Sequence, residues 1–359
     1  MRFGEPLSDE RLVSLLRPGG GIDTVITADA YGAGEADTLL GTALEGVPRE
    51  SYSLVGAVGH DIYDGQRLGA KGYARFTDPE LRGPGEFGDY LRRATELSLR
   101  RIGVDAFDVL LLHNPDRTGY TSPEVWEGLA SLRAEGLAHA LGVAPGPANG
   151  FTLDVIDCLE RFGELIDWAM VILNPMEPWP GELVLPAARR HGVRIIGRVV
   201  DYGGLFWDDV LPGHTFAEQD HRLHRPGGWI EAGRERLERM RPIAERHGLT
   251  PMQLACAWDL AQEPVRCVAP TLIEEPDSPK PIEAKRAELA AVPAGVVLSE
   301  SEVAELRSIG DNTGSMALKG ASPDHDGPAQ PDRWALDEEL EQVAARWAID
   351  PARQLTYAG

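Results

Sequence analysis

The sequence lacks the features that mark secreted and membrane-spanning proteins. Its three cysteines form no CxxC pair and are too few for a disulfide framework, which is typical of a reducing compartment. No run of about 18 apolar residues occurs, so no membrane-spanning helix is predicted. The first residues also lack the charged and apolar regions of a signal peptide. We therefore expect a cytoplasmic protein with no membrane partner.

Positive charge is scarce as well. The 359 residues include 35 Lys and Arg against 57 Asp and Glu, which gives a formal net charge of −22. A nucleic acid or an anionic membrane requires a basic surface, so we expect neither as a partner. Any phosphate that this chain binds must be held by a local cluster of cations. The apolar fraction of 43% is ordinary for a globular enzyme, and we expect a small-molecule ligand.

Short apolar runs alternate with longer helical patterns through most of the chain. The runs are continuous rather than alternating, which is typical of parallel strands that are covered on both faces. Seven such runs favour a (β/α)8 TIM barrel over an open sheet, and no GxGxxG follows the first run, so a Rossmann domain is the weaker interpretation. Capping patterns predict helices that begin after Ser122, Thr250 and Ser299. The expected strands are residues 24–28, 53–58, 108–113, 140–143, 168–173, 194–200 and 267–269.

The barrel is expected to span residues 1–309, with its first strand truncated or missing. Only residues 1–4 precede a helix expected over 8–16, so either the sequence begins inside a longer gene product or the barrel closes imperfectly. Residues 310–359 are predicted to be a C-terminal extension rather than a second domain, with one helix packed on the barrel. That helix carries an apolar stripe of Leu336, Leu340, Val343 and Trp347.

Chemistry in a TIM barrel is built at the carboxyl ends of the strands. In this sequence those ends carry polar, ionisable and aromatic side chains above apolar strands, which is typical of a small-molecule active site. We therefore predict an enzyme. The residues expected to contact its substrate are His60, Asp61, Asn114, Trp179, Arg198 and Asp201.

A histidine near a carboxylate, such as His60 beside Asp61, is a candidate general base. Arg198 at the barrel mouth would hold a carboxylate, a phosphate or an enolate-like oxygen, and the alternative is a structural ion-pair network around it. Histidines and an aspartate also gather in the loop after the expected strand at 194–200. Their spacing matches no metal motif, so we predict a solvated or substrate-covering loop and no metal site. They are His214, Asp220, His221 and His224.

Two stretches resemble the signatures of the aldo/keto reductase family. The first is similar to the family pattern D-T-A-x-x-Y-G, followed by a glycine, an acid and L-G-x-A-L. It reads Thr27-Ala28-Asp29-Ala30-Tyr31-Gly32, Gly34-Glu35, Leu40-Gly41 and Ala43-Leu44. The second lies over residues 98–116 and is similar to S-L-x-x-L-G-x-D-x-x-D-L-x-x-x-H-x-P-D. The resemblance covers roughly residues 3–306 and implies a reductase built on a TIM barrel.

In that family a tyrosine donates a proton to a carbonyl while NADPH delivers hydride, and a histidine orients the substrate. The resemblance implies that Tyr31 is the general acid and His113 the orienting residue. It also implies NADP or NAD as cofactor. The residues expected to bind this cofactor are Asn174, Thr271, Lys280, Lys285 and Arg286.

The sequence departs from the family at the residues that assist the tyrosine. A Lys paired with an Asp normally lowers the tyrosine pKa, but Ile26 stands at the Asp position. The Lys position falls near Ala57, which is apolar. Lys71 in the following loop is a candidate replacement, although a surface lysine is the better interpretation. Without the pair, Tyr31 is expected to keep a high pKa and to be a poor acid.

The expected cofactor site departs from the family in three further places. Ala144-Pro145 replaces the Ser-Asn that holds the nicotinamide carboxamide, and neither side chain is a donor or acceptor. Arg198 replaces the aromatic residue that stacks on the nicotinamide. Three acids, Glu274, Glu275 and Asp277, would repel a 2′-phosphate, with the three cations named above to offset them.

Three functions remain in consideration. The first is an aldo/keto reductase-like oxidoreductase that acts on a carbonyl or sugar-like compound with an atypical active site. The second is a cofactor-independent lyase, epimerase or isomerase on the same barrel, which the lost residues favour. The third is a non-catalytic barrel that binds a ligand.

Overall fold

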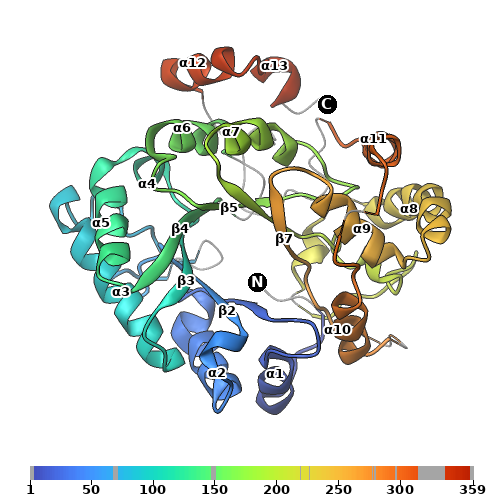
Figure 1. Ribbon diagram of the computed structural model, residues 1–359, viewed down its shortest axis with the longest axis horizontal. Coiled ribbons are helices and arrows are strands. Elements are labelled where there is room, and N and C mark those ends of the chain that lie inside the picture. The colour runs from blue at the N-terminus through green and yellow to red at the C-terminus, as the bar shows by residue number, and fades with distance from the viewer. Residues whose placement is uncertain are drawn as a thin grey trace.

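The structure is a computed structural model, and it describes residues 4–67, 72–146, 151–218, 220–225, 227–276, 278, 280–295, 297–313 and 336–355. Seven strands form one parallel sheet in which each strand pairs with the next along the chain. The sheet curls into a barrel wall with the helices outside it, which confirms the predicted TIM-barrel fold (Figure 1). The strands are β1 (Thr24–Ile26), β2 (Ser53–Val58), β3 (Phe107–His113), β4 (Ala138–Ala144), β5 (Trp168–Ile172), β6 (Arg194–Arg198) and β7 (Val265–Ala269).

The sheet formed by the described residues does not close on itself. Within the described residues no strand precedes the first helix, and β1 and β7 do not pair with each other. The truncated first strand was expected at residues 1–4, of which residues 1–3 lie outside the described part of the chain. In the part of the chain that the structure describes, the sheet has two edge strands, and one of them, β1, has only 3 residues.

The helices begin where the capping patterns predict. Ser122 accepts a hydrogen bond from the Val125 amide, and Thr250 forms a capping box with Gln253. The helices are α1 (Asp9–Leu16), α2 (Glu35–Leu44), α3 (Phe87–Ile102), α4 (Arg117–Thr121), α5 (Pro123–Ala134), α6 (Thr152–Phe162), α7 (Leu185–Arg190), α8 (Trp229–Arg246), α9 (Pro251–Leu260), α10 (Ile282–Ala290), α11 (Glu300–Ile309), α12 (Glu338–Arg346) and α13 (Pro351–Gln354). None of the described helices is long and apolar enough to cross a bilayer.

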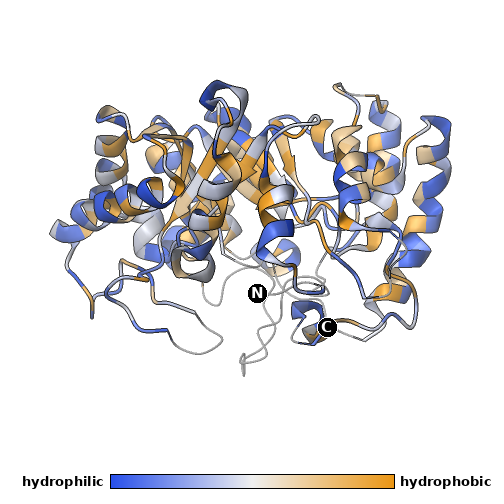
Figure 2. Ribbon diagram, turned by 90° about the horizontal axis from the view of Figure 1, so that it is seen from below, coloured by the Kyte–Doolittle hydropathy of each residue, from blue (hydrophilic) through white to orange (hydrophobic). Residues whose placement is uncertain are grey.

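The barrel interior and the layer between strands and helices form two apolar clusters. Figure 2 shows hydrophobic strands at the centre and helices that alternate between apolar and polar positions. The larger cluster joins the outer faces of the strands to the helices. The smaller one fills the interior with side chains from alternate strand positions, as in other TIM barrels. Its buried members are Ala28, Val55, Ala57, Val109, Leu111, Ala144, Met170 and Ile196.

The strand register brings the predicted site residues to one end of the barrel. His113 pairs with Ala144, and Arg198 pairs with Ala269, so each is the last residue of its strand. β6 was expected to continue to residue 200 but ends at Arg198, because Val199 has a positive φ of 59° and leaves the extended conformation.

The C-terminal segment lies outside α6 and α7 in Figure 1. Leu340 and Val343 of α12 are fully buried, and the Trp347 indole donates to Glu160 of α6 at 2.9 Å. Two short helices, α12 and α13, stand where one was expected.

Candidate active site

Tyr31 stands on the short turn that joins β1 to α2. It opens a 3-10 turn, Tyr31–Gly34, in which Gly34 has a φ of 98° that a residue with a side chain adopts only under strain. The Tyr31 side chain is 52% exposed. Its ring meets the His113 ring edge-on, with centroids 5.7 Å apart and planes at 89°. The structure therefore brings the two residues expected to be catalytic into contact.

His113 ends β3 and is buried. Burial lowers its pKa to about 3, and the positive potential of His60, Arg75 and Arg198 acts in the same direction. Its Nδ1 atom is buried and has no hydrogen-bond partner among the described residues. The imidazole is therefore neutral, and it is suited to hydrogen bonding rather than to donating a proton.

His60 lies on the other side of His113, with ring centroids 5.1 Å apart. Its Nε2 atom is 3.0 Å from the Asn114 amide nitrogen, and its Nδ1 atom is 3.0 Å from the Tyr73 carbonyl oxygen. Burial, followed by the charge of Arg75, lowers the pKa of His60 to about 4. The predicted substrate residues His60 and Asn114 thus belong to one neutral network around His113.

Arg198 reaches from the end of β6 toward the end of β4. Its Nη2 atom donates to the carbonyl oxygen of Gly146 at 2.5 Å and lies 3.4 Å from that of Pro145. Its Nε atom is buried and has no hydrogen-bond partner in the described part of the chain. Partial desolvation raises the pKa of Tyr31 above its usual value, while the charge of Arg198 lowers it. The alternative considered for Arg198, a structural ion-pair network, does not form among the described residues.

Arg75 is a member of this site that sequence reasoning missed. It lies in the loop after β2, where its Nη1 atom is 3.0 Å from His60 Nδ1 and its Nε atom donates to the Asn114 carbonyl. Nothing in its sequence neighbourhood separates it from a surface arginine. The bridge between residues 60 and 75, which folds the loop back onto the mouth, is visible only in three dimensions.

Asp61, by contrast, supports a turn. It is 0% exposed, forms an ion pair with Arg82, and accepts hydrogen bonds from the amides of Tyr63 and Asp64. Burial alone would raise the pKa of Asp61, but the Asp64 amide and Arg82 hold it below its usual value. Its side chain therefore does not serve as a partner of His60.

Asp201 also joins loops. It accepts a hydrogen bond from the Thr271 amide at 2.7 Å and another from the Gly204 amide at 3.0 Å. Burial raises the pKa of Asp201. The Thr271 carbonyl in turn accepts from the Trp207 indole at 2.9 Å. Asp201 and Thr271 thus tie the loop after β6 to the loop after β7.

Asn174 and Trp179, in the loop after β5, are both buried. The side-chain nitrogen of Asn174 donates to the Val199 carbonyl at 3.1 Å, and its side-chain oxygen accepts from the Met176 backbone amide at 2.9 Å. The Trp179 amide donates to the Asn312 side chain at 3.0 Å. Both residues are engaged within the protein, and their predicted ligand contacts remain predictions.

The cations expected near a cofactor phosphate are also engaged. Lys285 is 0% exposed, lies 2.6 Å from Asp209, and donates to the Ile273 carbonyl at 2.6 Å. An ammonium held in this way is part of the folded framework rather than a free anion site.

Lys280 and Arg286 have internal partners as well. Lys280 forms an ion pair with Glu288 and donates to the Trp207 carbonyl at 3.1 Å. Arg286 donates to the carbonyl of Arg17 at 2.7 Å. In addition, the Glu274 carboxylate accepts from the Ile282 amide at the start of α10, a position that favours an anion.

The histidine-containing loop after β6 is organised by a buried arginine. Arg222 is 1% exposed and forms ion pairs with Asp220 at 2.7 Å and Glu275 at 2.5 Å. His214 lies 3.1 Å from Glu275, and the Gly4 amide donates to Asp220 at 2.6 Å. The carboxylates are therefore neutralised by an arginine.

In the part of the chain that the structure describes, no group of three His, Cys, Asp or Glu is arranged to hold a metal ion. Lys71 and Asp277 lie outside the described residues, as does the side chain of His224.

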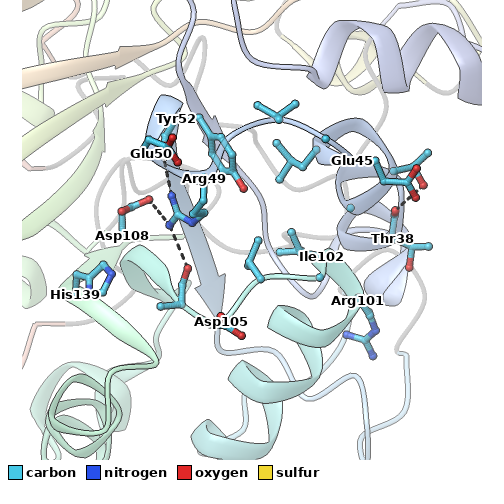
Figure 3. Close-up of a pocket in the computed structure, with 18 of the residues that line it drawn as sticks. Thr38, Glu45, Arg49, Glu50, Tyr52, Arg101, Ile102, Asp105, Asp108 and His139 are labelled. Carbon is cyan, nitrogen blue, oxygen red and sulfur yellow. Dashed lines mark hydrogen bonds and ion pairs between the residues drawn. The ribbon is translucent and has the colours of Figure 1, made fainter.

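A hollow of about 1000 Å³ lies away from this site (Figure 3). It is formed at the amino ends of β2, β3 and β4, where Arg49 forms an ion pair with Asp108 at 2.7 Å and His139 lies at the rim. Because TIM-barrel chemistry is built at the opposite end, we do not place the active site there.

The comparisons with known proteins agree with the fold. The model of the aldo/keto reductase family matches residues 13–311. Probable aldo-keto reductase 1 of Glycine max is 25% identical over 268 residues, which are 72% of this chain and 70% of that protein. The structure is similar to the glycerol dehydrogenase of Gluconobacter oxydans, with a TM-score of 0.65, 21% identity and 91% of each chain covered. It is also similar to an aldo/keto reductase from Klebsiella pneumoniae solved with NADP and acetate, with a TM-score of 0.54, 22% identity, and 84% of this chain and 85% of that one covered. The chain belongs to the aldo/keto reductase family.

Proposed function

We propose that this protein is an oxidoreductase that acts on a small carbonyl compound, with Tyr31 as proton donor and His113 as the residue that orients the carbonyl. The observation that carries the proposal is the edge-on contact of the two rings, 5.7 Å apart, at the carboxyl end of the barrel. Membership of the aldo/keto reductase family supports the same chemistry.

The two side chains have complementary states for this task. Tyr31 has a proton to donate near neutral pH, because the ordinary pKa of a phenol is about 10; partial desolvation raises this pKa, and the charge of Arg198 opposes the rise. His113 is neutral because burial lowers its pKa to about 3, so it can hold a carbonyl oxygen by a hydrogen bond without competing as the acid. The charge of Arg198 stabilises the phenolate that remains after proton transfer, a role that the missing lysine would otherwise have.

The redox partner in this proposal is a nicotinamide dinucleotide, which supplies a hydride when bound. Two solved relatives were determined with NADP or NADPH, which supports this assignment. In the loop after β6, Arg225 has a buried Nη1 atom with no hydrogen-bond partner among the described residues, and such a donor suits a diphosphate.

The residues fit a 2′-phosphate poorly. Lys280, Lys285 and Arg286 all have partners within the protein. The carboxylate of Glu274 already occupies the start of α10. We therefore propose NAD rather than NADP as the preferred cofactor.

A second candidate is acid–base chemistry without a redox cofactor, as in a lyase, epimerase or isomerase. Arg198 favours it, because a charged side chain ends the strand on which the family places an aromatic residue against the nicotinamide.

Titration of the protein's tryptophan fluorescence with NADH and NADPH separates these functions. We expect saturable quenching by both, at lower concentrations of NADH, and weaker binding of both in Arg225→Met. The absence of saturable quenching up to millimolar concentrations of either would remove the oxidoreductase proposal and leave the cofactor-independent one.

A further inference from the structure

We propose that the substrate of this site carries a carboxylate next to its carbonyl group, and that Arg75 and Arg198 hold this carboxylate at the barrel mouth. The inference rests on the proposed function for the position of the carbonyl group. It adds the chemical class of the substrate, which is a 2-oxo acid.

The two arginines approach His113 from opposite sides. Arg75 lies on the His60 side, with its Nη1 atom 3.0 Å from the His60 ring. Arg198 lies on the β4 side, where it binds the Gly146 carbonyl, close to the residue that pairs with His113 across β3 and β4. A small ligand on His113 and Tyr31 would therefore lie between two guanidinium groups.

Neither guanidinium has a carboxylate partner in the protein. Among the described residues, Arg75 and Arg198 take part in no ion pair; both donate to backbone carbonyls, and Arg75 Nη1 also lies 3.0 Å from His60 Nδ1. Two other enclosed arginines are neutralised, Arg82 by Asp61 and Arg222 by Asp220, whereas Arg225 likewise has no ion pair among the described residues. The contrast is informative in a chain with 57 acidic residues and a net charge of −22.

Leaving two cations unpaired at a partly enclosed site has a desolvation cost, which a bound anion offsets. The potential of both arginines also acts on His113, where together with burial it keeps the imidazole neutral. The two arginines thus give the barrel mouth a positive charge in a strongly acidic protein, and positive charge at a site attracts anionic substrates.

The remaining donors favour a carboxylate over a phosphate. Nη2 of Arg198 and Nε of Arg75 already donate to backbone carbonyls, whereas Nε of Arg198 has no partner among the described residues. A planar group with two oxygens needs fewer donors than a phosphate with three.

The test compares pyruvate and phenylglyoxylate with their methyl esters, which keep the carbonyl and lack the charge. With NADH as reductant, we expect kcat/KM to be about tenfold to a hundredfold higher for the acids, as for a charge-assisted hydrogen bond. Arg198→Met and Arg75→Met should each reduce this acid-to-ester ratio toward one. Arg194→Met is the matched control, because Arg194 lies at the other end of β6, is exposed and stacks on Trp168, and there the ratio should not change.

Calorimetric titration with pyruvate and phenylglyoxylate alone separates this inference from the proposed function. If the esters are reduced as efficiently as the acids, the inference is wrong while the oxidoreductase stands. If no compound is reduced but an acid binds, and Arg198→Met abolishes that binding in a folded protein, the inference stands without the redox activity. If neither acid binds or turns over better than its ester, the carboxylate site is wrong.

Discussion

The Tyr31 ring stands perpendicular to the His113 ring, yet the two side chains have very different surroundings. The phenol is 52% exposed and the imidazole is 9% exposed, although the ring centroids are only 5.7 Å apart. The boundary between solvent and protein therefore runs between the proposed acid and the proposed orienting residue. A substitution of exposed Tyr31 should therefore affect activity much more than stability, whereas a substitution of buried His113 should affect both.

Replacing Tyr31 by Phe tests the proton donor. We expect kcat/KM for a carbonyl substrate to fall by about 10²–10⁴, because the hydroxyl proton is lost. The free energy of unfolding should change by less than about 0.5 kcal/mol, because the side chain is half exposed. Steady-state kinetics and urea unfolding measure the two effects. Undiminished turnover by the folded variant would remove Tyr31 from its role.

The two buried histidines should make the protein sensitive to acid. Burial lowers the pKa of His113 to about 3 and that of His60 to about 4, from an ordinary value of 6.5. Below pH 6.5 the unfolded chain therefore binds protons that the folded chain does not, and stability falls as the pH falls through this window. Each histidine contributes at most about 1.4 kcal/mol per pH unit.

Urea unfolding between pH 7 and 4.5 checks this dependence. In His113→Gln, the free energy of unfolding should decrease less steeply as the pH falls. The difference in slope should be no larger than the contribution of one histidine. His139→Gln serves as the control, because His139 is exposed, and it should leave the slope as it is. An unaltered slope in His113→Gln would contradict the neutral state that we assign to this imidazole.

Replacing Lys285 distinguishes a structural role of this residue from a role in binding the cofactor. We expect Lys285→Met to destabilise the fold by about 3–5 kcal/mol, because Asp209 is left as a buried charge without its partner 2.6 Å away. The ratio of NADPH to NADH affinity should not change. Thermal unfolding and fluorescence titration measure both quantities. A selective loss of NADPH binding would instead support the phosphate-binding role that the sequence predicts.

Gly197 of β6 faces a buried acid of α9. A Cβ atom at this position would lie 2.4 Å from an Asp259 carboxylate oxygen, and burial raises the pKa of Asp259 well above its ordinary value. We expect Gly197→Ala to cost about 1–3 kcal/mol of stability through this close contact. The cost should shrink in an Asp259→Ala background, which a double-mutant cycle would show. An equal cost in both backgrounds would place the strain elsewhere.

Much of the fold could be predicted from the sequence, because continuous apolar runs and capping residues are local signals. The expected strand at 53–58 agrees with β2, and Ser122 begins its helix as predicted. The strand that carries Arg198 ends earlier than expected. The apolar run continues to Val200, but the positive φ at Val199 ends the strand, and hydrophobicity alone does not reveal that turn.

The site was less predictable, because side-chain partners come from distant parts of the chain. The spacing of the family motif placed Tyr31 and His113 correctly at one end of the barrel. It did not indicate that Asp61 would form an ion pair with Arg82, or that Lys285 would form one with Asp209 from another loop. Arg75 was missed because a long loop folds it back onto His60.

Within the described residues β1 and β7 are the unpaired ends of the sheet, and this affects how the protein behaves among copies of itself. A closed cylinder of strands has no free backbone amides, whereas an unpaired strand can be extended by a strand from another molecule. Here one of the two free edges is only 3 residues long. So short an edge strand offers few hydrogen bonds to an incoming strand, and this limits aggregation at β1.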